Sequence, residues 1–151
     1  GAGMASSGTA GYVCGGYTGA ACVSTVDKFA VSDDGRTTLG TGLSSGRTTT
    51  GAMANSGTAG YVGGGNGNAT TVDKFAFSDD SRTTLGTGLS AGRSSAAGMA
   101  ESGTAGYFGG GNTSSQTVDK FAFSDDSRTT LGTGLSIVQQ GPMACADSGT
   151  L

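Results

Sequence analysis

Short apolar clusters recur along the chain at a fixed interval, and turns rich in glycine, serine, threonine and aspartate separate them. The segment 72–90, VDKFAFSDDSRTTLGTGLS, returns letter for letter at 118–136, and a copy at 26–44 differs only at Val31 and Gly35. Because the copies begin at residues 26, 72 and 118, the period is 46 residues. A period of this length is typical of solenoids, propellers and other arrays, so the repeat decides the fold.

Each repeat divides at its turn residues into four short segments, which the pattern predicts to be strands. Side chains alternate along a strand, so Phe75 and Phe77 share one face of the third segment, and Val72 and Ala76 share the other. Apolar residues on both faces indicate a strand packed between two neighbouring sheets. No window shows the helical period of about 3.6 residues over a helical length. The sequence therefore predicts an all-β chain.

A repeat of about 40–50 residues with four antiparallel strands is the unit of a β-propeller. We therefore expect three blades, at residues 1–45, 46–91 and 92–136. Residues 137–151 resume the opening letters of the repeat, and two readings of them stay open. They form a surplus first strand for ring closure or strand exchange, or the chain stops partway into a fourth blade.

The block GY(V/F)GGG, followed by a variable loop, VDKFAFS and GLSxGR, resembles a kelch repeat. In that family a double glycine ends the second strand, and an arginine precedes the next blade. The corresponding residues here are Gly15/Gly16, Gly63/Gly64 and Gly109/Gly110, with Arg47 and Arg93. The chain departs from the family in having no tryptophan; the nearest counterparts are Leu39, Leu85 and Leu131. The phrase GYFGGG is also similar to kelch-like repeats of phage-tail, other virion-associated and secreted bacterial proteins.

Three blades do not close a ring, because propellers typically have about 4–8 blades. A lone set of three would expose the flat apolar faces of its first and last blades, and exposed apolar patches mark interaction sites. Two identical chains of three blades give a six-bladed ring with two-fold symmetry. We therefore expect the chain to form a homodimer.

Composition and charge limit the kinds of partner that the chain can bind. The net charge is −3, and the eight lysines and arginines are spread along the chain. Nucleic-acid binding needs clustered cations, so we expect no nucleic-acid partner. No stretch of about 18 apolar residues is present, so we expect no membrane span. We also see no signal peptide at the N-terminus. The 31 glycines would suit a flexible chain, but the regular spacing of the apolar clusters favours a folded array.

The chain lacks a residue type that many catalytic centres need. The chain has no histidine, which excludes Ser-His-Asp and Cys-His centres and the usual zinc and copper sites. Paired aspartates such as Asp79 and Asp80 suit acid–base work or calcium, but their recurrence once per repeat beside an arginine favours a turn motif. Asp73 and Lys74 are interpreted as an exposed pair of little energetic value. We expect no enzyme activity, no cofactor and no metal.

The cysteines leave three alternatives. Cys14 and Cys22 flank one loop, so a hairpin disulfide is one. If the surplus strand pairs with the first repeat, a bond between Cys14 and Cys145 is the second, and three free thiols in a reducing cytosol are the third. A disulfide would indicate an oxidising compartment. An extracellular or virion-associated location is favoured over a cytoplasmic one.

The loops between the second and third segments vary while the strands do not, and function on such scaffolds often lies in the loops. The candidate ligand-binding residues there are Tyr17, Thr18, Asn66, Asn68, Asn112, Thr113 and Gln116. The leading hypothesis is a structural or binding scaffold, a kelch-like propeller made of identical chains. A glycan-binding lectin with one site per blade is the alternative. An enzyme and an ice-binding threonine-rich solenoid rank lower, the latter because 46 residues is long for one coil.

Overall fold

The computed structural model describes residues 1–112 and 116–141, and within them the chain forms three four-stranded antiparallel sheets and no helix. In each sheet the strands follow one another in chain order. The first sheet contains β1 (Ala2–Ser6), β2 (Ala10–Tyr17), β3 (Cys22–Ala30) and β4 (Arg36–Thr38). The second contains β5 (Gly51–Asn55), β6 (Ala59–Gly63), β7 (Val72–Ala76) and β8 (Arg82–Thr84). The third contains β9 (Ala97–Glu101), β10 (Ala105–Gly109), β11 (Val118–Ala122) and β12 (Arg128–Thr130).

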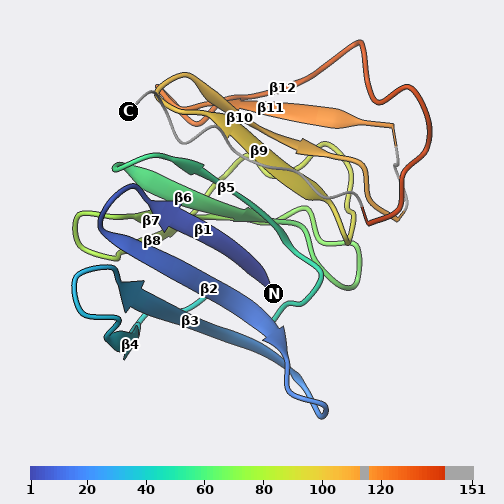
Figure 1. The fold of residues 1–151 in the computed structure, drawn as a ribbon. Coiled ribbons are helices and arrows are strands. Elements are labelled where there is room, and N and C mark those ends of the chain that lie inside the picture. The colour runs from blue at the N-terminus through green and yellow to red at the C-terminus, as the bar shows by residue number, and fades with distance from the viewer. Residues whose placement is uncertain (113–115, 142–151) are drawn as a thin grey trace.

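The three sheets, called blades 1, 2 and 3, are stacked as layers with blade 2 in the middle (Figure 1). Their first strands lie along one side of the stack, where β1 contacts β5 and β5 contacts β9. The prediction of an all-β chain with four antiparallel strands per repeat is confirmed, and the stack is open, not a closed ring. Residues 137–141 are irregular, and the rest of the expected surplus strand lies outside the described residues.

Glycine turns set the register of each blade. Gly8, between β1 and β2, has a φ of 67°, and its counterparts Gly57 and Gly103 have φ of 73° and 81°. L-residues rarely adopt this left-handed backbone, whereas glycine does so readily. The tight reversal pairs Ser6 with Ala10 and Met4 with Tyr12. Each inner strand is therefore held in a fixed register on the second strand.

The fourth predicted segment, RTTLGTGLS, is a strand over its first three residues only. Only its Arg-Thr-Thr run pairs with the third strand, and the following LGTGLS letters turn back between the blades. The N–H of Leu89 donates to the carbonyl of Thr70 at 2.7 Å, and the Leu89 side chain is buried. The connector therefore supplies a core leucine instead of more strand.

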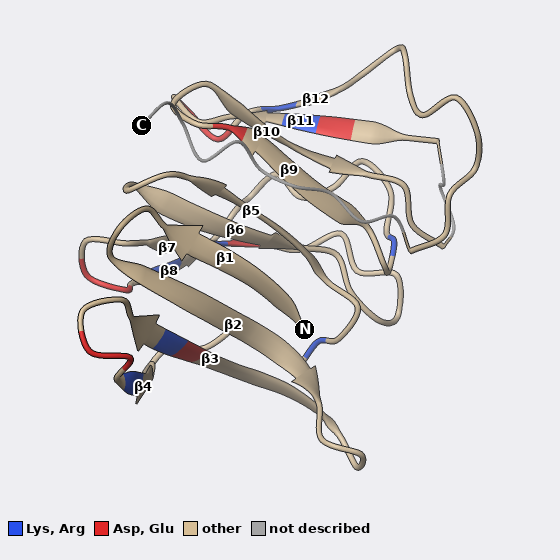
Figure 2. Ribbon diagram, viewed as in Figure 1, with Lys and Arg blue, Asp and Glu red and all other residues tan. Residues whose placement is uncertain are grey.

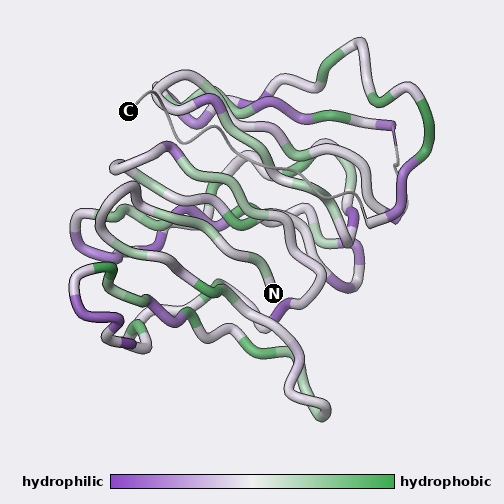
Figure 3. Tube along the Cα trace, viewed as in Figure 1, coloured by the Kyte–Doolittle hydropathy of each residue, from purple (hydrophilic) through white to green (hydrophobic). Residues whose placement is uncertain are grey.

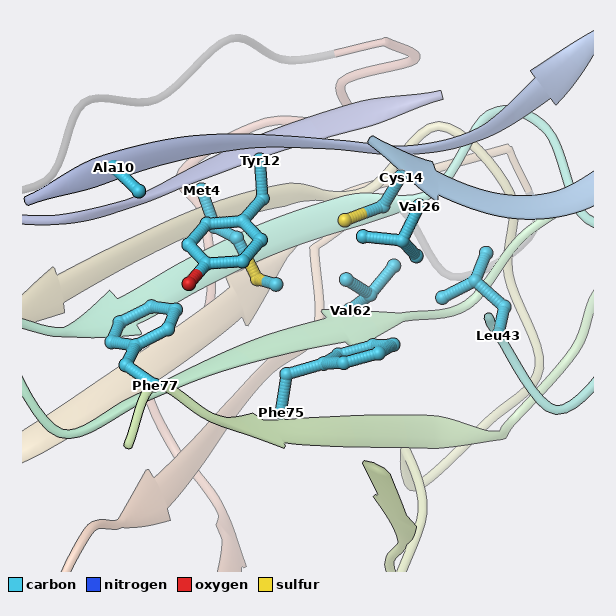
Figure 4. Packing of buried hydrophobic residues seen from close by; sticks show 9 residues of the cluster. All are labelled: Met4, Ala10, Tyr12, Cys14, Val26, Leu43, Val62, Phe75 and Phe77. Atoms are coloured by element: carbon cyan, nitrogen blue, oxygen red, sulfur yellow. The ribbon is translucent and has the colours of Figure 1, made fainter. Parts of the chain in front are cut away.

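The core lies between the blades. Between blades 1 and 2, Tyr12 stacks on Phe77 with ring centroids 5.1 Å apart, and Phe75 packs in the same cluster (Figure 4). Val72, on the opposite face of the same strand, packs in the cluster between blades 2 and 3. The prediction that the third strand has two buried faces is therefore confirmed for blade 2. Hydrophilic residues gather at the turns that leave β3 and β7 (Figure 3).

Candidate functional site

The blades are joined by one polar contact that is repeated at both junctions. The Tyr12 hydroxyl donates to Asp80 Oδ1 at 2.8 Å, and Lys28 Nζ donates to Asp80 Oδ2 at 2.8 Å. At the next junction Tyr61 and Lys74 bind Asp126 in the same way, at 2.7 Å each. Each lysine also lies over its tyrosine ring, within the range of a cation–π contact. Residues 52 apart in the chain are thus paired across each junction.

This contact changes the acid–base properties of its members. Burial, followed by the hydrogen bond to Asp80, raises the pKa of Tyr12. Burial and the bond to Asp126 raise the pKa of Tyr61 in the same way. The bond to Asp80 raises the pKa of Lys28. Tyr12 and Lys28 therefore hold their protons more strongly in this contact than they would in water.

A buried ion pair forms the second inter-blade contact. Arg47 and Arg93 lie in the connectors after blades 1 and 2, and their guanidinium groups bind Asp73 and Asp119 on the third strand of the following blade. Arg47 also donates to the carbonyl oxygens of Gly64 and Thr71 at 2.9 and 3.0 Å. Figure 2 shows these charges on the third strands and in the connectors.

The aspartate of this ion pair is fully buried and fully bonded. Asp73 accepts bonds from the Ser44 N–H and hydroxyl at 2.9 Å each, and from the Thr84 hydroxyl at 2.7 Å. Burial alone would raise the pKa of Asp73, but the bonds from Thr84 and Ser44 and the charge of Arg47 outweigh it, so the pKa is lowered. The expectation that Asp73 and Lys74 are an exposed pair of little value is wrong, because Asp73 is buried against Arg47 and Lys74 binds Asp126 of the next blade.

The two aspartates of each pair have different roles, as Asp79 and Asp80 show. Asp79 Oδ1 accepts the N–H of Ser81 at 3.0 Å, which is the expected turn contact. Asp80 has a φ of 58°, a left-handed backbone that asparagine and aspartate tolerate better than most residues, and it binds the preceding blade. The turn interpretation therefore holds for the first aspartate and misses the inter-blade role of the second.

Shape complementarity accompanies the polar contacts. A Cβ atom built on Gly60 would lie 2.1 Å from the sulfur of Met4, and one on Gly106 would lie 2.2 Å from that of Met53. Each inner-strand methionine therefore sits over the glycine of the next blade's second strand. A side chain at either glycine would force the methionine to move.

The outward face of blade 1 carries the same residues with no blade against them. This receiving face consists of Gly11, Val13, Asp27, Phe29, Val31 and Asp34. Val13, Phe29 and Val31 are 53%, 40% and 62% exposed, whereas Phe75 in blade 2 is fully buried. A Cβ on Gly11 would meet nothing within 4 Å. A groove of about 510 Å³ runs beside this face and is lined by β1, β2 and the inner strands β5 and β9.

The outward face of blade 3 carries the complementary set. This presenting face consists of Met99, Tyr107, Lys120 and Gln139. Met99 is 39% exposed, against 7% for Met4 and 2% for Met53. Within the described part of the chain, neither the Tyr107 hydroxyl nor Lys120 Nζ has a hydrogen-bond partner. Gln139 takes the place of Arg47 and Arg93, and its carbonyl likewise accepts a glycine N–H, from Gly111 at 3.1 Å.

The loop residues expected to bind ligand are partly engaged in holding connectors. Asn66 Oδ1 accepts the N–H of Thr48, and Asn112 Nδ2 donates to Ser94 Oγ, both at 2.9 Å. Asn68 lies in a turn with a φ of 57°, and Gln116 Nε2 donates to the carbonyl of Ser136 at 3.4 Å. Tyr17 is 61% exposed beside Thr18 at the end of the β2–β3 hairpin. Thr113 lies outside the described residues, and these side chains do not converge on one pocket.

The hairpin disulfide is not formed. Cys14 and Cys22 are both free, the first buried and the second partly exposed. Cys14 pairs with Val26 and Cys22 with Tyr17, so they are offset by three residues, or about 10 Å along the ladder. Cysteines whose Cα atoms lie more than about 7 Å apart cannot be bridged without backbone movement. Burial raises the pKa of the Cys14 thiol to about 12. Cys145 lies outside the described residues.

Among residues 1–112 and 116–141, no group of cysteines and carboxylates is placed to hold a metal ion. The same part of the chain contains no helix that is long and apolar enough to cross a membrane. Neither the family models nor the curated proteins contain a match to this chain.

Proposed function

We propose that the protein is a non-enzymatic scaffold, a kelch-like propeller assembled from identical chains. The observation that carries this proposal is the pair of end faces. Blade 1 exposes Val13, Phe29 and Val31, whose counterparts in blade 2 face the preceding blade, and blade 3 exposes Met99, whose counterparts Met4 and Met53 are buried. The buried ion pairs and the contacts of tyrosine and lysine with aspartate both lie at the junctions between blades.

The exposed apolar residues explain why the chain would associate. Burial of a Val, Phe or Met side chain contributes about 1.5–3 kcal/mol. Val13, Phe29 and Val31 on one end, and Met99 on the other, remain outside the core of the single chain. A second chain is the partner whose surface matches both ends, because it carries both.

Solution mass tests the proposal. Light scattering on the folded protein over a range of concentrations should give an assembly of at least two chains of 14.5 kDa. Repeating the measurement in reductant shows whether a disulfide between chains contributes to that mass. A chain with a β-sheet circular dichroism spectrum that keeps the mass of one copy at every concentration would refute the proposal.

A glycan-binding role is the second candidate, and one observation favours it. The β2–β3 hairpin is the longest of the three, with strands of eight and nine residues, and it holds Tyr17 61% exposed. Exposed aromatic rings present an apolar face and a polar tip to a ligand. Binding on a glycan array that is lost in Tyr17→Ala and kept in Ile137→Ala, at another exposed apolar residue, would support a lectin. Equal binding by both variants would exclude this hairpin as the site.

A further inference from the structure

We propose that copies of the chain join head to tail, with the presenting face of one copy on the receiving face of the next. In this junction Tyr107 and Lys120 bind Asp34 of the other copy, and Met99 sits over its Gly11. The inference deepens the proposed scaffold function and rests on it. It specifies the polarity of the assembly and the residues that form it.

The charges support this arrangement. Asp34 has a φ of 57°, against 58° and 59° for Asp80 and Asp126, so its backbone already has the conformation of the aspartates that bind a preceding blade. Within the described part of the chain the Asp34 carboxylate has no partner, and neither do Lys120 and Tyr107. A carboxylate on one end and an ammonium with a phenol on the other are thus left to bind each other. The same triad of tyrosine, lysine and aspartate is bonded at both internal junctions.

The same charges disfavour the other orientations. Two receiving faces packed together would bring Asp34 against Asp34 of the second copy, and Asp27 is already paired with Arg36 of its own chain. Two presenting faces would bring Lys120 against Lys120. Like charges brought together at an interface suppress the wrong pairing. The head-to-tail junction is the orientation that brings Lys120 of one copy to Asp34 of the next.

The shapes match as well. The strand position of Gly11 is open, whereas the equivalent positions Gly60 and Gly106 are filled by Met4 and Met53. Met99 is the third methionine of this series, and it is the exposed one. The open space over Gly11 lies on blade 1, and the exposed Met99 lies on blade 3. Met99 of one copy can therefore fill the space over Gly11 of the next copy.

The junction between chains would be weaker than the junctions within a chain. Gln139 stands where Arg47 and Arg93 supply the buried guanidinium, so Asp27 would receive no such partner. Val31 stands where Phe77 and Phe123 stack on a tyrosine. A head-to-tail junction repeats until the rotation closes, so it gives a ring or an open filament. Either assembly has this junction.

Charge exchange tests the pairing. Asp34→Lys and Lys120→Asp should each weaken assembly at least about 100-fold, because each places like charges at the junction. An equimolar mixture of the two variants should regain the wild-type mass, since every junction in an alternating assembly again pairs one ammonium with one carboxylate. Two folded variants that stay single when mixed, or that each assemble like wild type, would overturn the proposal.

Two further pairs of variants guard against misfolding and separate this proposal from the scaffold function. Asp34→Asn keeps a residue that tolerates the left-handed backbone and should weaken assembly, whereas the neighbouring Asp33→Asn should not. Gly11→Val fills the open seat and should abolish assembly without destabilising the single chain; Gly86→Val, at another open glycine, is its control. Wild-type assembly that survives both Asp34→Asn and Gly11→Val refutes this junction and leaves the scaffold function standing. A wild type that is a single chain refutes both.

Discussion

The junctions within the chain and its two ends are built from the same letters but differ in environment. The sequence VDKFA forms the third strand of all three blades. In blade 2 Asp73 and Phe75 are fully buried, whereas in blade 1 the side chain of Asp27 is 32% exposed and Phe29 is 40% exposed. The difference is the presence or absence of a preceding blade. A residue buried at an internal junction therefore has an equivalent at an end of the stack, and the same substitution at that equivalent position is its control.

The comparison shows that stability in this fold belongs to junctions more than to blades. Stacked repeats derive much of their stability from nearest-neighbour interfaces. A substitution at an internal junction should therefore cost far more than the same substitution at an end. The following predictions use such pairs, beginning with the largest expected effect.

Asp119→Ala should be the most damaging substitution. It leaves the fully buried Arg93 guanidinium without its carboxylate, and breaking a buried ion pair typically costs about 3–5 kcal/mol. Asp27→Ala, at the equivalent but partly exposed position, should cost about 1 kcal/mol or less. Urea unfolding of both variants measures the difference. Equal losses would mean that the neighbouring blade does not determine the value of the aspartate.

Phe75→Ala should follow closely. Removal of a fully buried phenylalanine costs about 3–5 kcal/mol, since it loses burial and leaves a cavity. The same change at Phe29 removes a ring that is already 40% exposed and should cost less than half as much. The denaturation midpoints of the two variants test this. A Phe29→Ala loss as large as that of Phe75→Ala, measured below the concentration of assembly, would contradict the account.

Gly60→Ala should destabilise the chain by about 1–3 kcal/mol, because the added Cβ would lie 2.1 Å from the sulfur of Met4 and force it to move. Gly11→Ala meets nothing within 4 Å and should be neutral or slightly stabilising. Thermal unfolding of the two variants gives the comparison. Tolerance of Gly60→Ala would show that Met4 does not fill this seat.

Tyr61→Phe should have the smallest effect at neutral pH, about 1 kcal/mol for a lost hydrogen bond. Its signature appears in alkali. The folded pKa of Tyr61 is raised above the unfolded value of about 10, so its contribution is complete below pH about 10 and is lost as pH rises toward the folded pKa. Tyr12, Lys28 and Cys14 shift in the same direction. Wild-type stability should therefore fall above pH about 10, and less steeply in Tyr61→Phe. Parallel pH profiles for the two proteins would contradict this.

The sequence was sufficient for the strands and insufficient for the contacts between them. The two apolar faces of the VDKFAFS segment and the glycine turns follow from alternation and backbone sterics, which are local. The bond between Lys28 and Asp80 joins residues 52 apart, and no local pattern contains that distance. One signal was present: Arg47 and Arg93 occur only before a following blade, and Gln139 replaces them at the end. That pattern indicated a role toward the next blade, and hence a buried partner for it.

Zero-length carbodiimide coupling tests the central claim most directly, because it joins an amine to a carboxylate that already touch. In a mixture of isotope-labelled and unlabelled chains, mass spectrometry should find Lys28 joined to Asp80 and Lys74 joined to Asp126 within single chains, as their 2.8 and 2.7 Å contacts require. The account predicts a third product, Lys120 joined to Asp34, that links labelled to unlabelled chains. If the two internal products form and Lys120 is never found on Asp34 of another chain, the end faces do not pair and the account is wrong.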